Sequence, residues 1–197
     1  PQEPILLFLL DQVIRRDDGA ALGFVERALE GMGRGGIYDQ VGGGFHRYSV
    51  DEEWLTPHFE KMLYNQAQLG MVHLQAYQLT GQDFFARVAR QTCNYVLRDM
   101  QIEQGGYYSA TDADSEGEEG TFFTWSQSEL EKCLSPAQAE LAKSLFGVSP
   151  GGNFEGANIL HLSRSLSVSA REYGPDFYRD LDAVLMQLYQ VREQREH

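Results

Sequence analysis

The sequence predicts a mainly α-helical protein built from antiparallel helix pairs, in the manner of an α/α solenoid or toroid. Apolar residues recur at three- and four-residue intervals over several long stretches, which is the period of a helix with one buried face. Short turns containing glycine separate these stretches. β-Prone residues concentrate in residues 104–125, where we expect a small β-hairpin. Helix pairs joined in this way stack into repeating α/α architectures.

The first two helices are expected over residues 4–16 and 20–32. The first is apolar almost all round, as in a helix buried on most sides. Asp17 and Asp18 precede Gly19 between the two helices, and either aspartate can cap the second one. The buried face of the second helix is expected to carry Leu22, Val25, Ala28, Leu29 and Met32.

The next two helices are expected to form an α-hairpin. Thr56 can cap a helix and Pro57 suits the first helical position, so we expect a helix from these residues to Leu79. Gly81 can adopt positive φ in the short turn that follows. The partner helix is expected over residues 84–100. Its inward face is expected to carry Phe85, Val88, Ala89, Thr92, Tyr95, Val96 and Leu97.

The remaining elements are shorter. Ser126 and Ser135 are each followed three positions later by Glu or Gln, a spacing typical of capping boxes. Two short helices should therefore end near Leu134 and near Phe146.

The last part of the chain is loop-rich, with a short strand expected over residues 158–162. A final helix is expected over residues 170–192. One face of this helix is expected to carry Phe177, Leu181, Val184, Leu185 and Leu188.

Composition limits the function classes. A chain of 197 residues has the size of one domain or of a piece of a larger one, and its net charge of −13 repels nucleic-acid backbones and anionic membranes. Neither kind of partner is expected. Cys93 and Cys133 form no metal or disulfide pattern, and we interpret them as buried thiols in a reducing compartment. Without a signal peptide or spanning segment, a cytoplasmic protein is expected. Both ends of the chain indicate that neighbouring helices have been removed.

Residues 35–68 hold the densest set of chemically capable side chains. Three glycines at positions 42–44 invite comparison with a phosphate-binding loop, but the P-loop spacing is absent. These glycines can let the backbone pass close to a helix end, or let a substrate approach the backbone. We favour the second interpretation.

Polar side chains follow the glycines. His58 is expected in the first turn of a helix, where the helix dipole favours a neutral imidazole able to act as a base. Local packing or capping by His58 is the alternative. Glu60 and Tyr64 are four residues apart and, with Lys61, can present an acid, a phenol and a cation to a pocket. An ordinary surface contact explains the same spacing.

An acidic segment contains Asp112, Asp114 and Glu116. Position twelve of an EF-hand starting at Asp112 is Phe123 rather than Glu, which rejects an EF-hand, and no metal is expected. A looser Ca²⁺ site and a solvated turn are the remaining interpretations of this segment. Because sugars stack on aromatic rings and donate hydroxyl hydrogens, carboxylates beside aromatic residues such as Tyr107 also fit a carbohydrate pocket.

Two long segments carry a resemblance to a known family: GGIYDQVGGGFHRYSVDEEWLTPHFEKMLYNQAQL from Gly35 and GGYYSATDADSEGEEGTFFTW from Gly105. With GANIL near Asn158, they resemble signature segments of thioredoxin-domain-containing proteins that include the spermatogenesis-associated thioredoxin-like proteins. In that family a thioredoxin-like domain precedes a helical region similar to six-hairpin (α/α)₆ toroids. Relatives of the toroid include N-acylglucosamine 2-epimerase, cellobiose 2-epimerase and several glycosidases.

The resemblance implies that the whole chain is part of one toroid domain, without the thioredoxin-like domain and the last hairpins. It further implies a concave, sugar-sized site at the helix ends. The epimerases use paired histidines and an arginine, but no motif carries those histidines onto this chain. One fold also hosts many activities.

Our hypothesis is a carbohydrate-binding or carbohydrate-active segment, similar to sugar epimerases that work by general acid–base chemistry and binding a mono- or disaccharide. No cofactor is expected. The alternatives are a non-catalytic scaffold for a thioredoxin-like domain in the full-length protein, and a glycosidase-like hydrolase. The candidate catalytic residues are His58, His46 and Glu60. The candidate substrate-binding residues are Asp39, Arg47, Trp54, Lys61, Tyr64, Tyr107, Asp112, Asp114 and Glu116.

Overall fold

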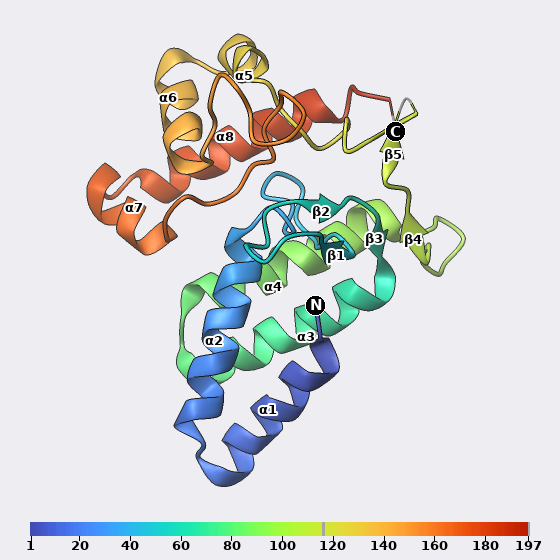
Figure 1. Cartoon of the computed structure of the whole chain (residues 1–197), viewed down its shortest axis with the longest axis vertical. Helices are drawn as coiled ribbons and strands as arrows, with labels where there is room; N and C mark the ends of the chain where they lie inside the picture. The colour runs from blue at the N-terminus through green and yellow to red at the C-terminus, as the bar shows by residue number, and fades with distance from the viewer. Residues whose placement is uncertain (116, 197) are drawn as a thin grey trace.

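The computed structural model describes residues 1–115 and 117–196 and confirms a mainly α-helical fold with a small β-hairpin (Figure 1). Its helices are α1 (Glu3–Arg16), α2 (Gly19–Arg34), α3 (Leu63–Thr80), α4 (Asp83–Tyr95), the π-helical turn η1 (Val96–Met100), α5 (Gln127–Cys133), α6 (Pro136–Leu145), α7 (Leu166–Tyr173) and α8 (Phe177–Arg192). Its strands are β1 (Tyr48–Ser49), β2 (Pro57–His58), β3 (Lys61–Met62), β4 (Ala110–Thr111), β5 (Asp114–Ser115) and β6 (Glu118–Glu119).

Helices α1 to α4 form the lower half of the molecule as two helical hairpins (Figure 1). As expected, Asp18 caps α2, and its Oδ1 accepts hydrogen bonds from the backbone N–H groups of Ala20 and Ala21. Gly81 ends α3 with a φ of 70°. The core of this half is contributed by Leu6, Leu10, Val25, Leu29, Met32, Ile37, Phe45, Leu69, Val72 and Phe85.

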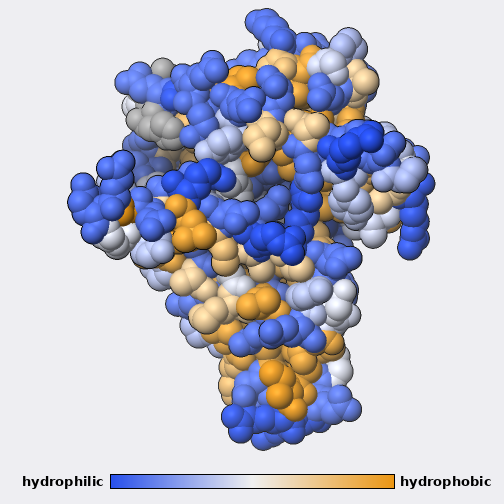
Figure 2. Space-filling view, turned by 180° about the vertical axis from the view of Figure 1, so that it is seen from behind, coloured by the Kyte–Doolittle hydropathy of each residue, from blue (hydrophilic) through white to orange (hydrophobic). Residues whose placement is uncertain are grey.

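The narrow end of this half, made by α1 and α2, carries apolar patches among hydrophilic residues (Figure 2). Phe8, Ile14 and Phe24 are each more than half exposed there. No helix in the described ranges is long and apolar enough to cross a membrane.

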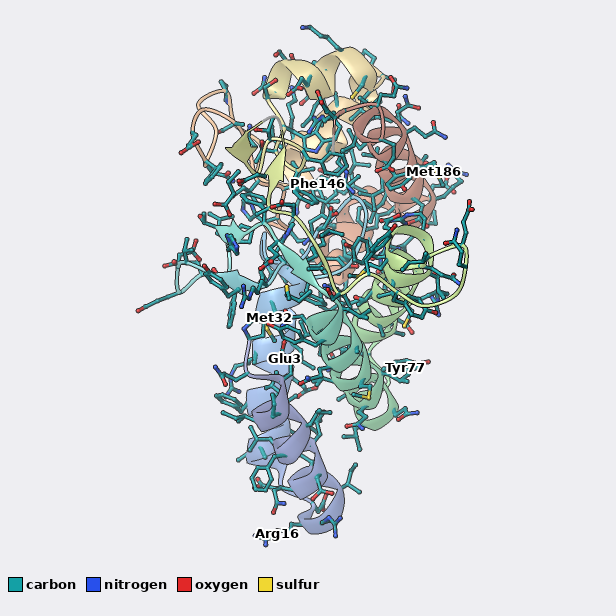
Figure 3. All side chains as sticks on the ribbon, turned by 90° about the vertical axis from the view of Figure 1, so that its right-hand side faces the viewer. Glu3, Arg16, Met32, Tyr77, Phe146 and Met186 are labelled. Atoms are coloured by element: carbon teal, nitrogen blue, oxygen red, sulfur yellow. The ribbon has the colours of Figure 1, made fainter. Side chains whose placement is uncertain are left out.

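Helices α5 to α8 form the upper half around a second core (Figures 1 and 3). Both predicted capping boxes are present, with Ser126 capping α5 and Ser135 capping α6. The predicted face of the last helix is buried. The core of this half is contributed by Trp125, Leu130, Leu145, Phe146, Phe177, Leu181, Val184, Leu185 and Leu188.

The strands pair in three antiparallel two-stranded sheets, β1 with β2, β3 with β4 and β5 with β6. The sheet of β5 and β6 is the predicted hairpin, but each strand has only two residues. The sheet of β3 and β4 holds the end of residues 35–60, which contain the three glycines and which we call the glycine-rich loop, beside the acidic segment, with Lys61 opposite Thr111 and Met62 opposite Ala110. Two segments far apart in sequence are thereby fixed side by side.

The expected start of the third helix is wrong, because α3 begins at Leu63 rather than at Thr56. The Asp51 carboxylate accepts hydrogen bonds from the backbone N–H groups of Leu55 and Thr56, at 2.9 and 2.6 Å. This tight loop brings β2 back antiparallel to β1. Residues 56–62 are therefore not helical, and His58 lies in a strand.

Three further expectations differ from the structure. The final helix is two helices, because Gly174 at a φ of 87° ends α7 and a proline follows it. The strand expected over residues 158–162 is reduced to a single bridge between Trp125 and Asn158. Leu97 is 56% exposed, since it lies in the π-helical turn, where the period of the buried face changes.

The two cysteines also differ from expectation. Cys93 is exposed and Cys133 is half-buried, and both are free thiols.

Candidate functional site

A cavity of about 490 Å³ lies where the acidic segment, β3, the end of α4 and the end of α8 meet. Its lining includes Lys61 of β3, Asp112 and Asp114, three residues that the sequence singles out. We call it the central cavity. The rest of its lining consists of Tyr95, Asp99, Thr111, Ala113, Phe122, Phe123, Arg192 and Glu193.

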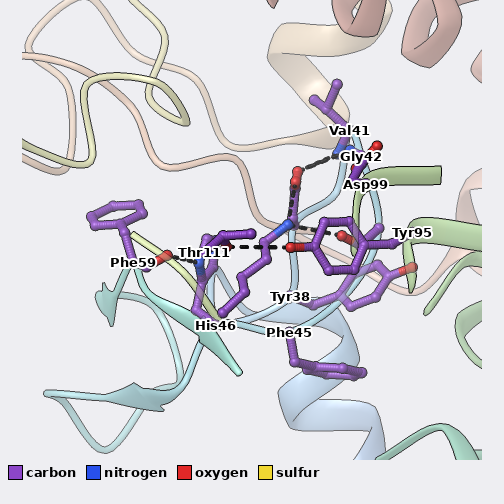
Figure 4. A network of polar contacts seen from close by, with 12 residues as sticks. Tyr38, Val41, Gly42, Phe45, His46, Phe59, Tyr95, Asp99 and Thr111 are labelled. Atoms are coloured by element: carbon purple, nitrogen blue, oxygen red, sulfur yellow. Dashed lines mark hydrogen bonds and ion pairs between the residues drawn. The ribbon is translucent and has the colours of Figure 1, made fainter. Parts of the chain in front are cut away.

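Lys61 and Arg192 of this lining form a buried ion cluster with Asp39, and each of the three residues is at most 6% exposed. The Lys61 ammonium donates to Asp39 Oδ2 at 2.8 Å, and Arg192 Nη1 donates to Asp39 Oδ1 at 2.8 Å. The backbone N–H groups of Val41 and Gly42 complete the shell of this carboxylate, each at 3.0 Å from Oδ1 (Figure 4). One carboxylate thus joins the loop, β3 and α8.

Burial and neighbouring charges shift the pKa values of Lys61 and Asp39. Burial lowers the pKa of Lys61 to about 8, against the opposing attraction of Asp39. Burial alone would raise the pKa of Asp39, but Arg192 and Lys61 outweigh it and hold that pKa well below its usual range. Both groups are therefore charged near neutral pH.

Aromatic rings enclose the cations. The Lys61 ammonium lies 4.2 Å from the ring centroid of Tyr95 and 5.0 Å from that of Phe123. Its remaining hydrogen bond goes to the Gly43 carbonyl at 2.9 Å. Burial raises the pKa of Tyr95 to about 12, and its hydroxyl lies 3.3 Å from that of Thr111 (Figure 4). Lys61 is held from several sides.

His46 lies next to this cluster and is buried at 2% exposure. Its Nδ1 is 2.8 Å from the Phe59 carbonyl oxygen, which can only accept, so Nδ1 carries the hydrogen (Figure 4). The rings of Phe59 and Phe123 pack edge-on against it. Burial, followed by the charge of Lys61, lowers the pKa of His46 to about 3, so its imidazole is neutral near pH 7.

The three glycines are required by neighbouring parts of the same chain. A Cβ at Gly42 would lie 2.1 Å from Arg192 Nη2, and one at Gly43 would lie 2.7 Å from the Gln91 carbonyl oxygen. Gly43 and Gly44 also have positive φ, 77° and 79°. Side chains and backbone of this protein therefore fill the space that we expected a substrate to use. The close-packing interpretation of the glycines is the one that the structure supports.

Arg47, His58 and Glu60 lie together in a second, more exposed group with Glu119, which we call the outer cluster. His58 Nδ1 is 2.7 Å from Glu119 Oε1, and Arg47 donates to Glu60 at 2.8 Å. Glu119 Oε1 also accepts from the Phe59 N–H at 3.1 Å, which ties β6 to the loop. None of these four residues lines the central cavity. The helix dipole that we invoked for His58 does not act on it, because the residue precedes α3.

The other candidate residues are dispersed. Tyr64 is 47% exposed in the first turn of α3, and it does not share a helix with Glu60. Trp54 packs on the core of the lower half, with a φ of 63°. Tyr107 is 44% exposed and does not line the central cavity. Glu116 lies outside the described residues.

The main residue that our sequence reasoning missed is Arg192, which contacts Asp39 from 153 positions away. A signal was present, since Arg192 follows Leu188 by four residues and so continues the apolar face of α8. A cation at such a position must find a buried partner. Asp99, on the turn after α4, is a second lining residue that no local spacing indicated.

Among the described residues, no group of three or more His, Cys, Asp or Glu side chains is arranged to hold a metal ion. A larger cavity, of about 760 Å³, lies between α4 and α7 and contains none of the candidate residues. We assign the candidate site to the smaller one, because there a buried ion cluster meets residues of both signature segments.

Comparisons with known proteins find similar proteins in mammals and in a nematode. The chain is 36% identical to mouse spermatogenesis-associated protein 20 and 35% identical to the human protein of that name, in both cases over 99% of this chain. An uncharacterized protein of Caenorhabditis elegans is 36% identical over 66% of the chain. The chain spans 29% of the length of the two mammalian proteins. No protein-family model matches it.

Proposed function

The homology supports membership of the spermatogenesis-associated protein 20 family, and we propose that the central cavity of this chain binds a mono- or disaccharide. The observation that carries the proposal is the lining of the cavity. Aromatic rings of Tyr95 and Phe123 lie in one cavity with the carboxylates of Asp99, Asp112 and Asp114. Sugars bring apolar faces for the rings and hydroxyl donors for the carboxylates.

The size of the cavity supports the same ligand class. About 490 Å³ lies within the range of small-molecule sites in proteins, roughly 300–1,000 Å³. The Asp112 Oδ1 atom accepts from the backbone N–H groups of Ala113 and Asp114, so this carboxylate is held in place before a ligand arrives. A pre-positioned acceptor loses little freedom on binding.

The proposal is for binding rather than turnover by this chain. A general base needs access to substrate and a pKa near the working pH. His46 is buried with a pKa of about 3, Lys61 is fully engaged, and His58 and Glu60 lie in the outer cluster. Epimerase-like chemistry would therefore take its base from parts of the longer protein beyond this chain, whereas the carboxylates of Asp99, Asp112 and Asp114 are the groups of this chain that glycosidase-like chemistry would use. We place that protein in the cytoplasm, in keeping with the free thiols.

Calorimetric titration of the full-length protein with a panel of mono- and disaccharides tests the proposal. At least one sugar should bind, and Asp114→Ala should weaken its affinity about tenfold, the effect of losing one hydrogen bond to a charged group. Glu103→Ala is the matched control, because it removes one exposed carboxylate that does not line the cavity. Absence of heat with every sugar would overturn the proposal.

A second candidate function is a helical scaffold for a thioredoxin-like domain of the longer protein, as part of a toroid of helical hairpins. The observation that favours it is the buried ion cluster, because its charged groups pair with one another and thereby join α8 to the loop. For such a scaffold, the cavity variant Asp114→Ala would leave the activity of the whole protein unchanged. Loss of that activity in Asp114→Ala, with the fold intact, would exclude a purely structural role.

A further inference from the structure

The larger cavity is a groove of about 760 Å³ between the lower and upper halves. Its floor comes from the ends of α2 and α3 and from α4, and its far wall comes from α7 and α8, which lie next to these ends in Figure 1. Tyr77, labelled in Figure 3, marks the α3 side of the rim. We call it the arginine groove. It shares no lining residue with the central cavity.

Three guanidinium groups line the arginine groove, from Arg34, Arg87 and Arg90, against two carboxylates, Glu30 and Asp83. The central cavity has the opposite balance, with two cations against four carboxylates. An excess of cations is notable in a chain whose net charge is −13. Because charges more than about 8 Å apart are screened at physiological salt, the local groups decide what the groove attracts.

The three arginines are only partly neutralised within the chain. The Arg90 side chain is exposed and has no hydrogen bond or ion pair with any residue that the structure describes. Arg34 reaches Glu30 and the Leu162 carbonyl only at 3.4 Å, and its Nε has no partner in the described part of the chain. Arg87 is paired with Asp182 at 2.6 Å. The Arg90 guanidinium is thus available for an incoming anion, and that of Arg34 is held only by long hydrogen bonds.

Hydroxyl-bearing residues line the wall opposite these arginines. Ser165 and Ser167 at the start of α7 line it, and so does Tyr178 of α8. Hydroxyls and guanidinium forks are the groups that bind phosphate oxygens in proteins. The groove also has apolar lining, from Phe84, Leu166 and the ring of Tyr77, which suits an organic group.

We propose that the arginine groove binds a small molecule that carries a phosphate group. Arg34 and Arg90 bind the phosphate from the lower half, the serines of α7 bind it from the upper half, and the organic group lies on the apolar lining. Such a ligand touches both halves of the molecule. The site is separate from the carbohydrate site and does not depend on it.

Calorimetry on the full-length protein tests the site with three probes: inorganic phosphate, phenyl phosphate and phenol. Phenyl phosphate should bind, phenol should not, and the affinity for phenyl phosphate should fall as salt is raised. The tighter binder of phenyl phosphate and inorganic phosphate identifies the source as a phosphate ester or as the free anion. No binding of either phosphate overturns the proposal.

Arg90→Ala is the decisive variant, because Arg90 is exposed and its side chain makes no hydrogen bond or ion pair with a described residue. It should weaken phenyl phosphate binding about tenfold, and Arg90→Lys should lie between it and the wild type. Arg171→Ala is the matched control, since it removes one exposed arginine from the other end of α7, outside the groove, and should change affinity less than about twofold. Asp114→Ala, in the central cavity, should also leave phosphate affinity unchanged. Equal binding by Arg90→Ala and the wild type overturns the proposal.

Discussion

The buried ion cluster and the outer cluster contain the same kinds of residue in very different surroundings. Asp39, Lys61 and Arg192 are almost completely removed from water, whereas Arg47 and Glu60 keep 45% and 24% of their side-chain surface. The Arg47–Glu60 pair of the outer cluster and both ion pairs of Asp39 have the same N–O distance, 2.8 Å. The difference teaches that distance alone does not rank an ion pair, because the cost of an unpaired charge depends on burial.

The largest expected effect is that of Asp39→Asn. The variant keeps the shape of the side chain but leaves the charges of Lys61 and Arg192 buried without a counter-ion. We expect a loss of about 3–5 kcal/mol in the free energy of unfolding, the usual cost of breaking a buried pair. Urea denaturation of the variant and the wild type measures it.

The control for this variant is Lys61→Met, which removes one cation and leaves Asp39 paired with Arg192. It should cost less than Asp39→Asn, although it removes a larger charged side chain. If Lys61→Met were the more damaging of the two, packing around Tyr95 rather than charge balance would govern the cluster.

The next effect concerns pH and His46. Its pKa is about 3 in the folded protein and 6.5 ordinarily, so between these values the unfolded chain binds a proton that the folded chain does not. The contribution of His46 to stability is therefore complete above pH 6.5 and is lost as the pH falls toward 3. His46→Gln, whose amide can still donate to the Phe59 carbonyl, should flatten this dependence.

Urea midpoints at pH 7 and pH 4.5 measure the slope for the wild type and for His46→Gln. His73, whose pKa burial lowers to about 4, remains in both proteins and contributes to both slopes equally. The range stays above the ordinary pKa of Asp39, 3.8, so that residue does not add to it. Equal slopes would mean that His46 is hydrated in the folded state.

Local sequence patterns were enough to predict most of the helices. Ser126 and Ser135 act within one turn of their own helices, and the face of α8 follows from its period alone. Thr56 and Pro57 carry equally good local signals for a helix start and yet lie before α3. There the hydrogen bonds to the Asp51 side chain and the pairing of β1 with β2 hold the backbone in a non-helical conformation.

The site was predictable only in part, for the same reason. Asp112 and Asp114 were identified from an acidic segment beside aromatic residues, and Lys61 from a stretch dense in polar side chains; β3 pairing with β4 brings the two segments together. The roles of His46 and His58 were not predictable, since they depend on burial and on partners such as Glu119, 61 positions away from His58. Arg192 could be found only by asking which charged residue continues an apolar helix face.

The smallest effect is expected from Arg47→Ala in the outer cluster. The guanidinium is solvated, and water and salt screen most of its attraction to Glu60. The unfolding midpoint of this variant should therefore match that of the wild type within experimental error.

Glu119→Ala is the informative comparison, because Glu119 binds both His58 and the Phe59 N–H and so joins β6 to the loop. It should lower the midpoint measurably while remaining well short of Asp39→Asn. A drop for Arg47→Ala as large as that for Asp39→Asn would show that the outer cluster, rather than the buried one, holds the loop in place. In that case the contrast in burial between the two clusters would not translate into a contrast in energy.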